Sequence, residues 1–162
     1  MIYEPREDSF LLRKWVKKLA FGKVLDMGTG SGIQADAAKE KGLDVVTVDI
    51  NPEVRADIHS DLFENVSGKF DTIIFNPPYL PEDEYDKDVA NVGGKEGYET
   101  ILRFLDQAYE HLTDEGIILI VFSTLSKPEV ILSHAKKKYK VEILEKLKIP
   151  FEELYCVMLK KL

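Results

Sequence analysis

The sequence predicts a doubly wound α/β fold with a mostly parallel sheet, and we expect residues 1–162 to form a single domain. Apolar segments of strand length alternate with segments of helical periodicity along the chain. A glycine-rich turn directly follows the first apolar strand, as it does in nucleotide-binding folds of this class. Short polar side chains also stand where several strands end, which is where open α/β sheets bind their ligands.

The N-terminal half should supply two helices and several short strands. The first helix is indicated by apolar residues that share one helical face: Leu11, Leu12, Trp15, Val16 and Leu19. Asp8 or Ser9 can cap its N-terminus, and we expect this helix to pack against the sheet edge near the ligand. Strands are predicted at residues 24–27, 44–48 and 71–75, with a helix over 33–41. The stretch 52–60 is short for a crossover helix, so either that connection is abbreviated or the strand expected before Asp61 is misplaced.

The C-terminal half continues the alternation. A helix is indicated by core residues at helical spacing, namely Tyr98, Ile101, Leu102, Leu105, Tyr109 and Leu112. Residues 116–122 are continuously apolar, as expected for a central strand that is covered on both faces. We then expect a helix over 128–139 and strands at 140–147 and 153–160. The carboxyl ends of the strands would carry four polar residues: Asp26, Asp49, Asp61 and Asn76.

The glycine-rich turn has the layout of a nucleotide-binding loop. Its glycines, Gly28, Gly30 and Gly32, stand between an apolar strand and a helix and let a ligand approach the backbone closely. Residue 33 is Ile, so the G-x-G-x-x-G dinucleotide fingerprint is not met. Asp49 ends the next apolar segment, where a carboxylate can accept both hydroxyls of a ribose, and Asp26 could pair with a cationic ligand. The alternative interpretation is a tight turn with a structural role only.

The segment Asn76-Pro77-Pro78-Tyr79 directly follows the strand at 71–75 and suits a site that binds a planar NH2 group. Proline lacks a backbone N–H group and fixes φ, so the carbonyl groups of this turn remain free to accept hydrogen bonds. Asn76 adds a side-chain oxygen, and Tyr79 could stack on a flat group. Two acceptors on the two hydrogens of an amide or aromatic amine would localise electron density on its nitrogen and favour methylation. The alternative is a proline-rich turn that only closes a buried strand.

Together these motifs resemble the class I S-adenosylmethionine-dependent methyltransferases. Residues 26–32 match their cofactor loop, and Asp49 matches their ribose-binding acid. The segment at 76–79 narrows the resemblance to the HemK-type glutamine methyltransferases. Residues 3–12 are similar to the opening of the short archaeal and eukaryotic branch of that family, in which a Thr usually stands where this chain has Ser9.

The resemblance implies S-adenosyl-L-methionine as the cofactor and a role for each motif residue. At the cofactor we expect Gly28, Gly30 and Gly32 along its length, Asp49 at the ribose, Asp61 with the Leu62 backbone at the adenine, and Ser9 with Asp26 at the methionine end. At the target NH2 group we expect Asn76, the Pro77 carbonyl and Tyr79. Residues 93–97 resemble the family's glycine-rich substrate-side loop, with Lys95 where Arg is usual.

The resemblance also implies a substrate and a partner. The substrate would be the glutamine of a Gly-Gly-Gln loop in a class-1 peptide release factor, since flanking glycines let a loop enter a narrow cleft. Members of the short branch commonly work with a small zinc-binding activator protein, so we expect a heterodimer. The longer branch carries an N-terminal recognition domain, which is not expected here because the family motif starts at Tyr3.

Composition and charge narrow the partners further. Hydrophobic residues make up 44% of the chain and charged residues 31%, without repeats, so a folded domain is expected. The net charge of −7 disfavours a nucleic-acid partner. Neither a segment of membrane-spanning length nor a signal-peptide pattern is found, which predicts a cytoplasmic location. The acidic run at 82–88 is interpreted as a solvated loop, with a landing surface for a basic protein as the functional alternative.

The cysteine and the histidines do not suggest chemistry. The single cysteine, Cys156, excludes an intrachain disulfide and lies in an apolar segment, so a buried structural role is expected. His59, His111 and His134 lack the spacing of metal ligands, and no metal site is predicted.

Two other functions stay open from the sequence. An adenine-amine methyltransferase acting on DNA or RNA uses the same Asn-Pro-Pro-Tyr segment on another planar NH2 group, but it needs a flipped or single-stranded base. The acidic charge and the lack of a target-recognition region speak against it. A non-catalytic relative that binds only cofactor or a partner is the second, and the intact segment at 76–79 argues against lost catalysis.

Overall fold

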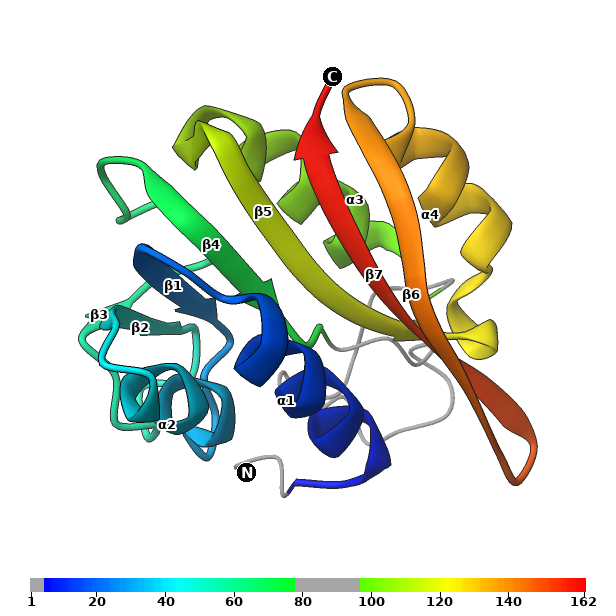
Figure 1. The fold of residues 1–162 in the computed structure, drawn as a ribbon, viewed down its shortest axis with the longest axis horizontal. Coiled ribbons are helices and arrows are strands. Elements are labelled where there is room, and N and C mark those ends of the chain that lie inside the picture. The colour runs from blue at the N-terminus through cyan, green and yellow to red at the C-terminus, as the bar shows by residue number, and fades with distance from the viewer. Residues whose placement is uncertain (1–4, 78–96) are drawn as a thin grey trace.

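The computed structural model describes residues 5–77 and 97–162, which form a seven-stranded sheet with helices on both faces (Figure 1). The strands are β1 (Lys23–Met27), β2 (Asp44–Asp49), β3 (Ile58–His59), β4 (Phe70–Phe75), β5 (Leu112–Ser123), β6 (Tyr139–Ile149) and β7 (Glu152–Lys161). The α-helices are α1 (Glu7–Leu19), α2 (Ile33–Glu40), α3 (Glu99–Ala108) and α4 (Pro128–Ala135), and the 3₁₀ turns are η2 (Tyr109–His111) and η3 (Thr124–Ser126).

The strand order β3-β2-β1-β4-β5-β7-β6 confirms the predicted doubly wound, mostly parallel sheet. Strands β1 to β5 pair in parallel, and β7 is antiparallel to both β5 and β6. The chain starts in the middle of the sheet at β1, moves outward to β3 and then crosses back to β4. The carboxyl ends of β1 and β4 therefore lie side by side at the point where the strand order reverses, which is the usual ligand site of such folds.

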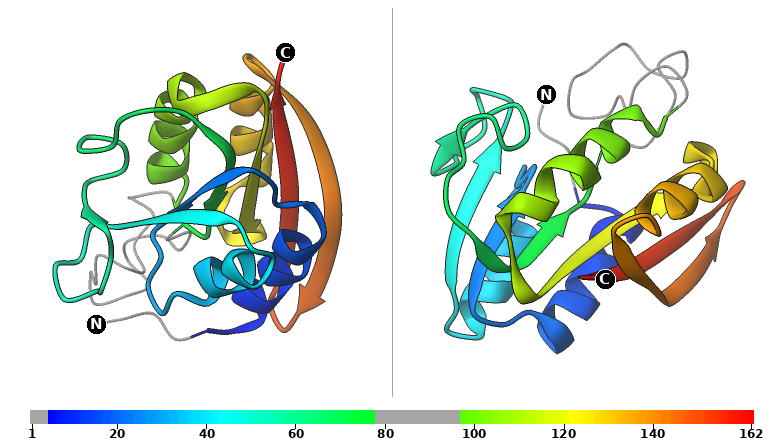
Figure 2. Two further views of the ribbon diagram at one scale, coloured as in Figure 1. Left: turned by 60° about the vertical axis from the view of Figure 1, so that its left-hand side comes forward. Right: turned by 90° about the horizontal axis from the view of Figure 1, so that it is seen from above.

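Helices α1 and α2 cover one face of the sheet, and α3 and α4 cover the other (Figure 2). The buried side chains of β5 alternate between the two faces: Ile117, Leu119 and Val121 pack under α1 and α2, and Ile118, Ile120 and Phe122 pack under α3 and α4. Because successive side chains of a strand point to opposite faces, burial on both faces requires a continuous apolar segment. The central strand predicted at 116–122 is thus confirmed.

Strand β5 begins earlier than its apolar segment. Leu112 pairs with Phe70 and Ile117 pairs with Thr72, so β5 carries extra residues between these two pairs. Gly116 lies in this irregular stretch, where an added Cβ would come within 2.6 Å of Leu112 Cδ1. The helix predicted through Leu112 was therefore wrong at its C-terminal end, because α3 stops at Ala108 and Leu112 belongs to the sheet.

Helix α1 differs from its prediction at its start. Arg6 is the N-cap residue, so the prediction of a cap by Asp8 or Ser9 was wrong, and both side chains lie buried in the first turn. The helix lies across the face of the sheet over β5 and β7 and reaches the edge strand β6, while its first turn lies at the predicted ligand site, where Ser9 contacts Asn76 and Gln34. The Trp15 Nε1 group donates a hydrogen bond of 2.9 Å to Glu145 Oε1, which fixes α1 to β6.

The remaining connections are short. No helix stands between β2 and the two-residue β3. Of the two alternatives expected for residues 52–60, the abbreviated connection is therefore confirmed. The helix predicted over 128–139 ends at Ala135, because Tyr139 begins β6. Beyond the pair of Ser123 and Leu154, β6 and β7 continue as a hairpin that projects past the end of β5 (Figure 1, orange and red). Within the described ranges, every helix is too short or too polar to cross a lipid bilayer.

Candidate active site

The loop between β1 and α2 leaves its backbone open to a ligand. Gly28, Gly30 and Gly32 have φ values of 70°, 51° and 85°, a region in which glycine is favoured. The N–H groups of Gly28 and Thr29 both donate to Val48 O, at 2.8 and 2.9 Å, and tie the loop to β2. A Cβ at Gly32 would meet no atom within 4 Å, and one at Gly30 only the Gly28 carbonyl at 3.9 Å. A bound molecule could therefore lie directly against this backbone.

Asp49 ends β2 and is held by the same loop. Its Oδ2 accepts a hydrogen bond from Gly30 N, and its Oδ1 accepts one from Asn51 N, both at 2.9 Å. The side chain is only 8% exposed, so these two bonds fix its orientation. Each carboxylate oxygen can accept a further hydrogen bond. The geometry suits a ligand that presents two neighbouring hydroxyl groups.

Asp26 lies buried below the loop, near the end of β1. Its Oδ2 accepts a hydrogen bond of 2.7 Å from Thr29 Oγ1. Burial raises the pKa of Asp26 to about 7, although hydrogen bonds from Thr29 and from the Ala35 backbone lower it, and the negative charges of Asp49 and Asp36 raise it further. No cationic side chain of the described residues contributes to the pKa of this carboxyl group. A positively charged ligand would supply the missing stabilisation of its ionised form.

Asn76 directly follows β4 and meets the first turn of α1. Its Nδ2 donates to Ser9 Oγ at a long 3.5 Å. Its Oδ1 is buried and has no hydrogen-bond partner within the described part of the chain. A buried oxygen without a donor is costly, so such an atom in a folded protein calls for a function. Pro77, the next residue, is buried as well.

Gln34 is a residue of this region that sequence reasoning missed. It lies in the first turn of α2, is buried, and donates from Nε2 to Ser9 O at 2.8 Å. Its Oε1 also finds no partner among residues 5–77 and 97–162. Ser9 is therefore held between α2 and Asn76, so three segments far apart in sequence meet here. The signal in the sequence was a long amide side chain among the alanines of α2.

Asp61 and Leu62 lie just after β3 and are less closely integrated. Asp61 Oδ2 accepts a hydrogen bond of 3.1 Å from Arg103 Nη2 of α3, and both side chains remain about half exposed. Leu62 has a φ of 52°, and its side chain is buried. Arg103 stands far along the chain, so the sequence carried no signal for this ion pair. Tyr79 lies outside the described residues, and so does the loop at 93–97 except for Gly97.

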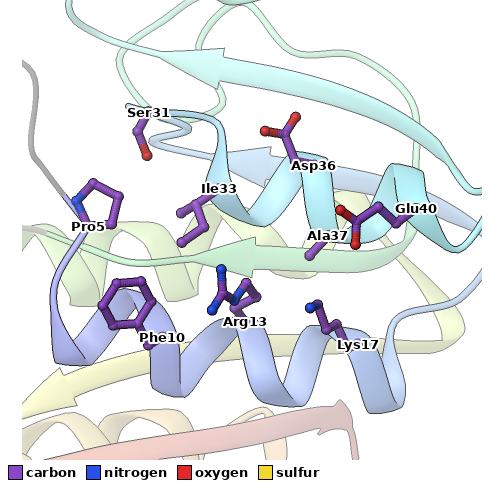
Figure 3. Close-up of a pocket in the computed structure, with 9 residues that line it drawn as sticks. All are labelled: Pro5, Phe10, Arg13, Lys17, Ser31, Ile33, Asp36, Ala37 and Glu40. Atoms are coloured by element: carbon purple, nitrogen blue, oxygen red, sulfur yellow. The ribbon is translucent and has the colours of Figure 1, made fainter.

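A separate pocket of about 450 Å³ lies between α1 and α2 (Figure 3). Arg13 and Lys17 line it from α1, and Asp36 and Glu40 line it from α2. None of the predicted site residues lines this pocket. It is a surface groove with charges of opposite sign on its two helices, and Ser31 and Ile33 line it at the end of the glycine-rich loop.

The histidines and the cysteine are structural. His59 and His111 contact the backbone carbonyls of Val54 and Gly68, and His134 contacts Asp106. Among the described residues, no three His, Cys, Asp or Glu side chains are grouped so that they could hold a metal ion. Cys156 is fully buried in β7, and burial raises the pKa of its thiol to about 12.

Comparison with known proteins decides the family. The model of the methyltransferase small domain matches residues 7–149. The chain belongs to this family of methyltransferases. The prediction of an enzyme that transfers methyl groups is thereby confirmed, and the match covers most of the described residues.

The relatives of this methyltransferase include HemK-type proteins, as predicted. A protein of Methanocaldococcus jannaschii named "Putative protein N5-glutamine methyltransferase" is 40% identical, over 96% of this chain and 90% of its own length. Methyltransferase HEMK2 of Mus musculus is 31% identical, over 85% of this chain and 78% of its own. The E. cuniculi Mtq2–Trm112 complex, which methylates the eRF1 translation termination factor, has been solved, and the fold resembles it with a TM-score of 0.83, 27% identity and 99% coverage of both chains.

Asp26 should make the stability of this methyltransferase depend on pH. Its pKa is raised from an ordinary 3.8 to about 7 in the folded chain, so between these values the folded state holds a proton that the unfolded state releases. The resulting stabilisation is complete below the unfolded pKa and is lost as the pH rises through the folded one. Asp26→Asn should therefore raise stability over the wild type more at about pH 8 than at about pH 5, as urea unfolding would measure.

Asp44→Asn is the matched control, since it removes an exposed carboxylate that is not among the charges acting on Asp26. This variant should keep the pH dependence of the wild type. Parallel stability curves for Asp26→Asn and the wild type would mean that Asp26 titrates as an ordinary aspartate.

Proposed function

We propose that this chain is an S-adenosylmethionine-dependent N-methyltransferase that acts on the glutamine amide of a Gly-Gly-Gln loop in a class-1 peptide release factor. The observation that carries the proposal is the buried Oδ1 of Asn76, which has no hydrogen-bond partner among residues 5–77 and 97–162 and lies beside the open glycine loop. This oxygen can accept a hydrogen bond from a bound ligand, and a primary amide has two N–H donors. The names of the relatives, which refer to protein glutamine and to a termination factor, support the same substrate.

The residues present fit the cofactor. The glycine loop has room above its backbone, and Asp49 keeps acceptor capacity for two ribose hydroxyls. No cationic side chain in the described part of the chain acts on the Asp26 carboxyl group. S-adenosylmethionine supplies a methyl group on a positively charged sulfur and is therefore already activated. We assign Ser9 to the methionine end, together with Asp26. Asp61 and the Leu62 backbone would take the adenine, with Asp61 also within reach of Arg103.

The main catalytic task of the chain is to hold and polarise the target nitrogen. The lone pair of an amide nitrogen is delocalised into the carbonyl group, which makes it a poor nucleophile. Asn76 Oδ1 and the Pro77 carbonyl would accept the two N–H hydrogens and localise that lone pair on nitrogen. The contact of Asn76 Nδ2 with Ser9 Oγ orients the side chain, and Tyr79 would pack on the flat amide. Positioning of this kind does not require a strong base.

We further infer that the active form contains a small zinc-binding activator protein. The similarity to the solved Mtq2–Trm112 complex supports a partner. The two sheet edges also differ in their protection against added strands. Edge strand β6 carries charged residues along its length, whereas β3 has only two residues and lies near the exposed Ile50. Charged side chains and very short strands both discourage the pairing of an added strand, so the exposed Ile50 beside β3 is the feature that an apolar surface of a partner could cover.

Loss of the Asp49 carboxylate should weaken cofactor binding. Asp49→Ala removes an acceptor for both ribose hydroxyls and should reduce the affinity for S-adenosylmethionine by roughly 1.5 to 3 kcal/mol, as measured by calorimetry. Asp44→Ala, at the other end of β2 and exposed, should bind like the wild type. If folded Asp49→Ala bound the cofactor normally, the ribose assignment would be wrong.

Loss of the Asn76 amide should affect the reaction rather than cofactor binding. Asn76→Ala is expected to lower the methylation rate by about a hundredfold or more while cofactor affinity stays nearly constant, because its oxygen acts on the target nitrogen. Single-turnover kinetics and calorimetry separate the two quantities. Asn65→Ala removes an exposed asparagine between β3 and β4 and should keep the rate. Full activity of Asn76→Ala would exclude the proposed polarisation.

The substrate is tested with isotope-labelled S-adenosylmethionine and three acceptors. These are an intact release factor, its Gln→Ala variant in the Gly-Gly-Gln loop, and oligonucleotides that contain adenine. The factor should be labelled, and the other two should not. Labelling of the oligonucleotides alone would favour the adenine-amine activity, and equal labelling of both factors would point to another residue. Each assay is run with and without a small zinc-binding partner, and equal rates would refute the heterodimer.

A further inference from the structure

The turn that closes the β6–β7 hairpin carries an apolar side chain that is not buried in the fold. Pro150 and Phe151 are the two residues between the paired Ile149 and Glu152. Phe151 is fully exposed to solvent. Its ring therefore adds no buried apolar area to the folding of this chain.

The backbone at Phe151 is also unfavourable for this residue type. Its φ is 68°, in the left-handed region. A proline followed by a residue with positive φ is the pattern of a type II turn, in which glycine is favoured at the second position. An aromatic residue in this conformation costs about 1 kcal/mol or more. The stability of the chain alone would favour glycine here, so the aromatic ring calls for a role outside the folded chain.

The turn is held in place at the same edge of the sheet as Asn76. Strand β7 is antiparallel to β5, so the start of β7 lies at the carboxyl end of β5. The buried Ser123 Oγ donates to Glu152 Oε1 at 2.6 Å, and Glu153 N donates to Thr124 Oγ1 at 3.0 Å. Figure 1 shows the tip of the hairpin projecting beyond the ends of β4 and β5. The ring is thus presented on a braced support at the ligand-binding edge.

The strand register gives the separation between the turn and Asn76. Phe75 lies opposite Ile120 of β5, and Ile120 lies opposite Val157 of β7. With about 4.8 Å between strands and about 3.4 Å per residue along β7, Phe151 lies roughly 20 Å from Asn76. A protein–protein interface of standard size covers about 800 Å² on each partner, or a patch roughly 30 Å across. One protein bound with its amide at Asn76 can therefore cover Phe151 as well.

We propose that Phe151 anchors the protein substrate by inserting its ring into an apolar pocket near the methylated loop. The inference rests on the function proposed above. Charged residues flank the turn in the strand register, with Lys148 paired with Glu153 and Glu152 directly after Phe151. An aromatic centre with a polar rim is the composition of an interaction hot spot. A partner that stays bound during turnover would obstruct the edge at which the substrate enters, which favours the substrate as the occupant.

Phe151→Asn tests this anchor, since asparagine tolerates a positive φ and removes the ring. The variant should be at least as stable in urea as the wild type. Its KM for an intact class-1 release factor should rise about tenfold or more, with kcat changed by less than about twofold. Its activity on a short synthetic peptide with the Gly-Gly-Gln sequence should not change. Phe151→Tyr keeps an aromatic ring and should restore the KM of the wild type.

Phe21→Asn is the matched control. It removes another exposed phenylalanine, which precedes β1 at the opposite edge of the sheet. An unchanged KM in Phe151→Asn, or an equal rise with the intact factor and the peptide, would refute the anchor and leave the proposed function in place. Lost binding of the zinc-binding partner in gel filtration would assign the turn to that partner instead. Wild-type enzyme that labels neither factor nor peptide, with the zinc-binding partner present, would overturn the proposed function and this inference with it.

Discussion

The parallel pairing of β1 with both β2 and β4 is the constraint on which the site depends. Met27 lies opposite Val48 on one side and opposite Phe75 on the other, so three strands end at one level. Asp26, Asp49 and Asn76 lie far apart in the sequence, and this register brings them together. If β4 ran the other way, Asn76 would lie at the opposite edge, about 20 Å away at about 3.3 Å for each of its residues. The two apolar layers matter to function because they hold this register.

Buried polar groups whose charge or hydrogen-bonding capacity the described residues leave uncompensated gather where the strands end. Asp26 is buried with a raised pKa, and Asn76 Oδ1 and Gln34 Oε1 lack donors among the described residues. Each such group lowers stability, and a stable sequence would normally avoid them. Their concentration beside one open loop means that a ligand with matching charge and donors relieves several unfavourable terms at once. Local departures from the rules of stability are expected at functional sites, and here they share one location.

The sequence predicted those features that depend on neighbouring residues. The strands, the glycine loop and the position of Asn76 after a strand follow from local periodicity and turn chemistry. The end of α3 was misplaced because Leu112 suits a helix, and only its pairing with Phe70 assigns it to the sheet. The contacts of Gln34 with Ser9 and of Arg103 with Asp61 join distant segments and leave no local pattern. The cap of α1 was wrong because Asp8 and Ser9 are drawn into buried contacts near Asn76.

The buried Cys156 is a natural probe for opening of the sheet. It is the single cysteine of the chain, and it lies in β7, which is paired on both sides with β5 and β6. Its raised pKa keeps the thiolate scarce at neutral pH, and burial keeps reagents away, so alkylation requires separation of these strands. The rate of alkylation therefore reports how often the antiparallel half of the sheet opens. In the strand order β7 lies three positions from β1, which leads into the glycine loop, so a ligand at that loop that slows this rate would do so by stabilising the sheet and not by shielding the thiol.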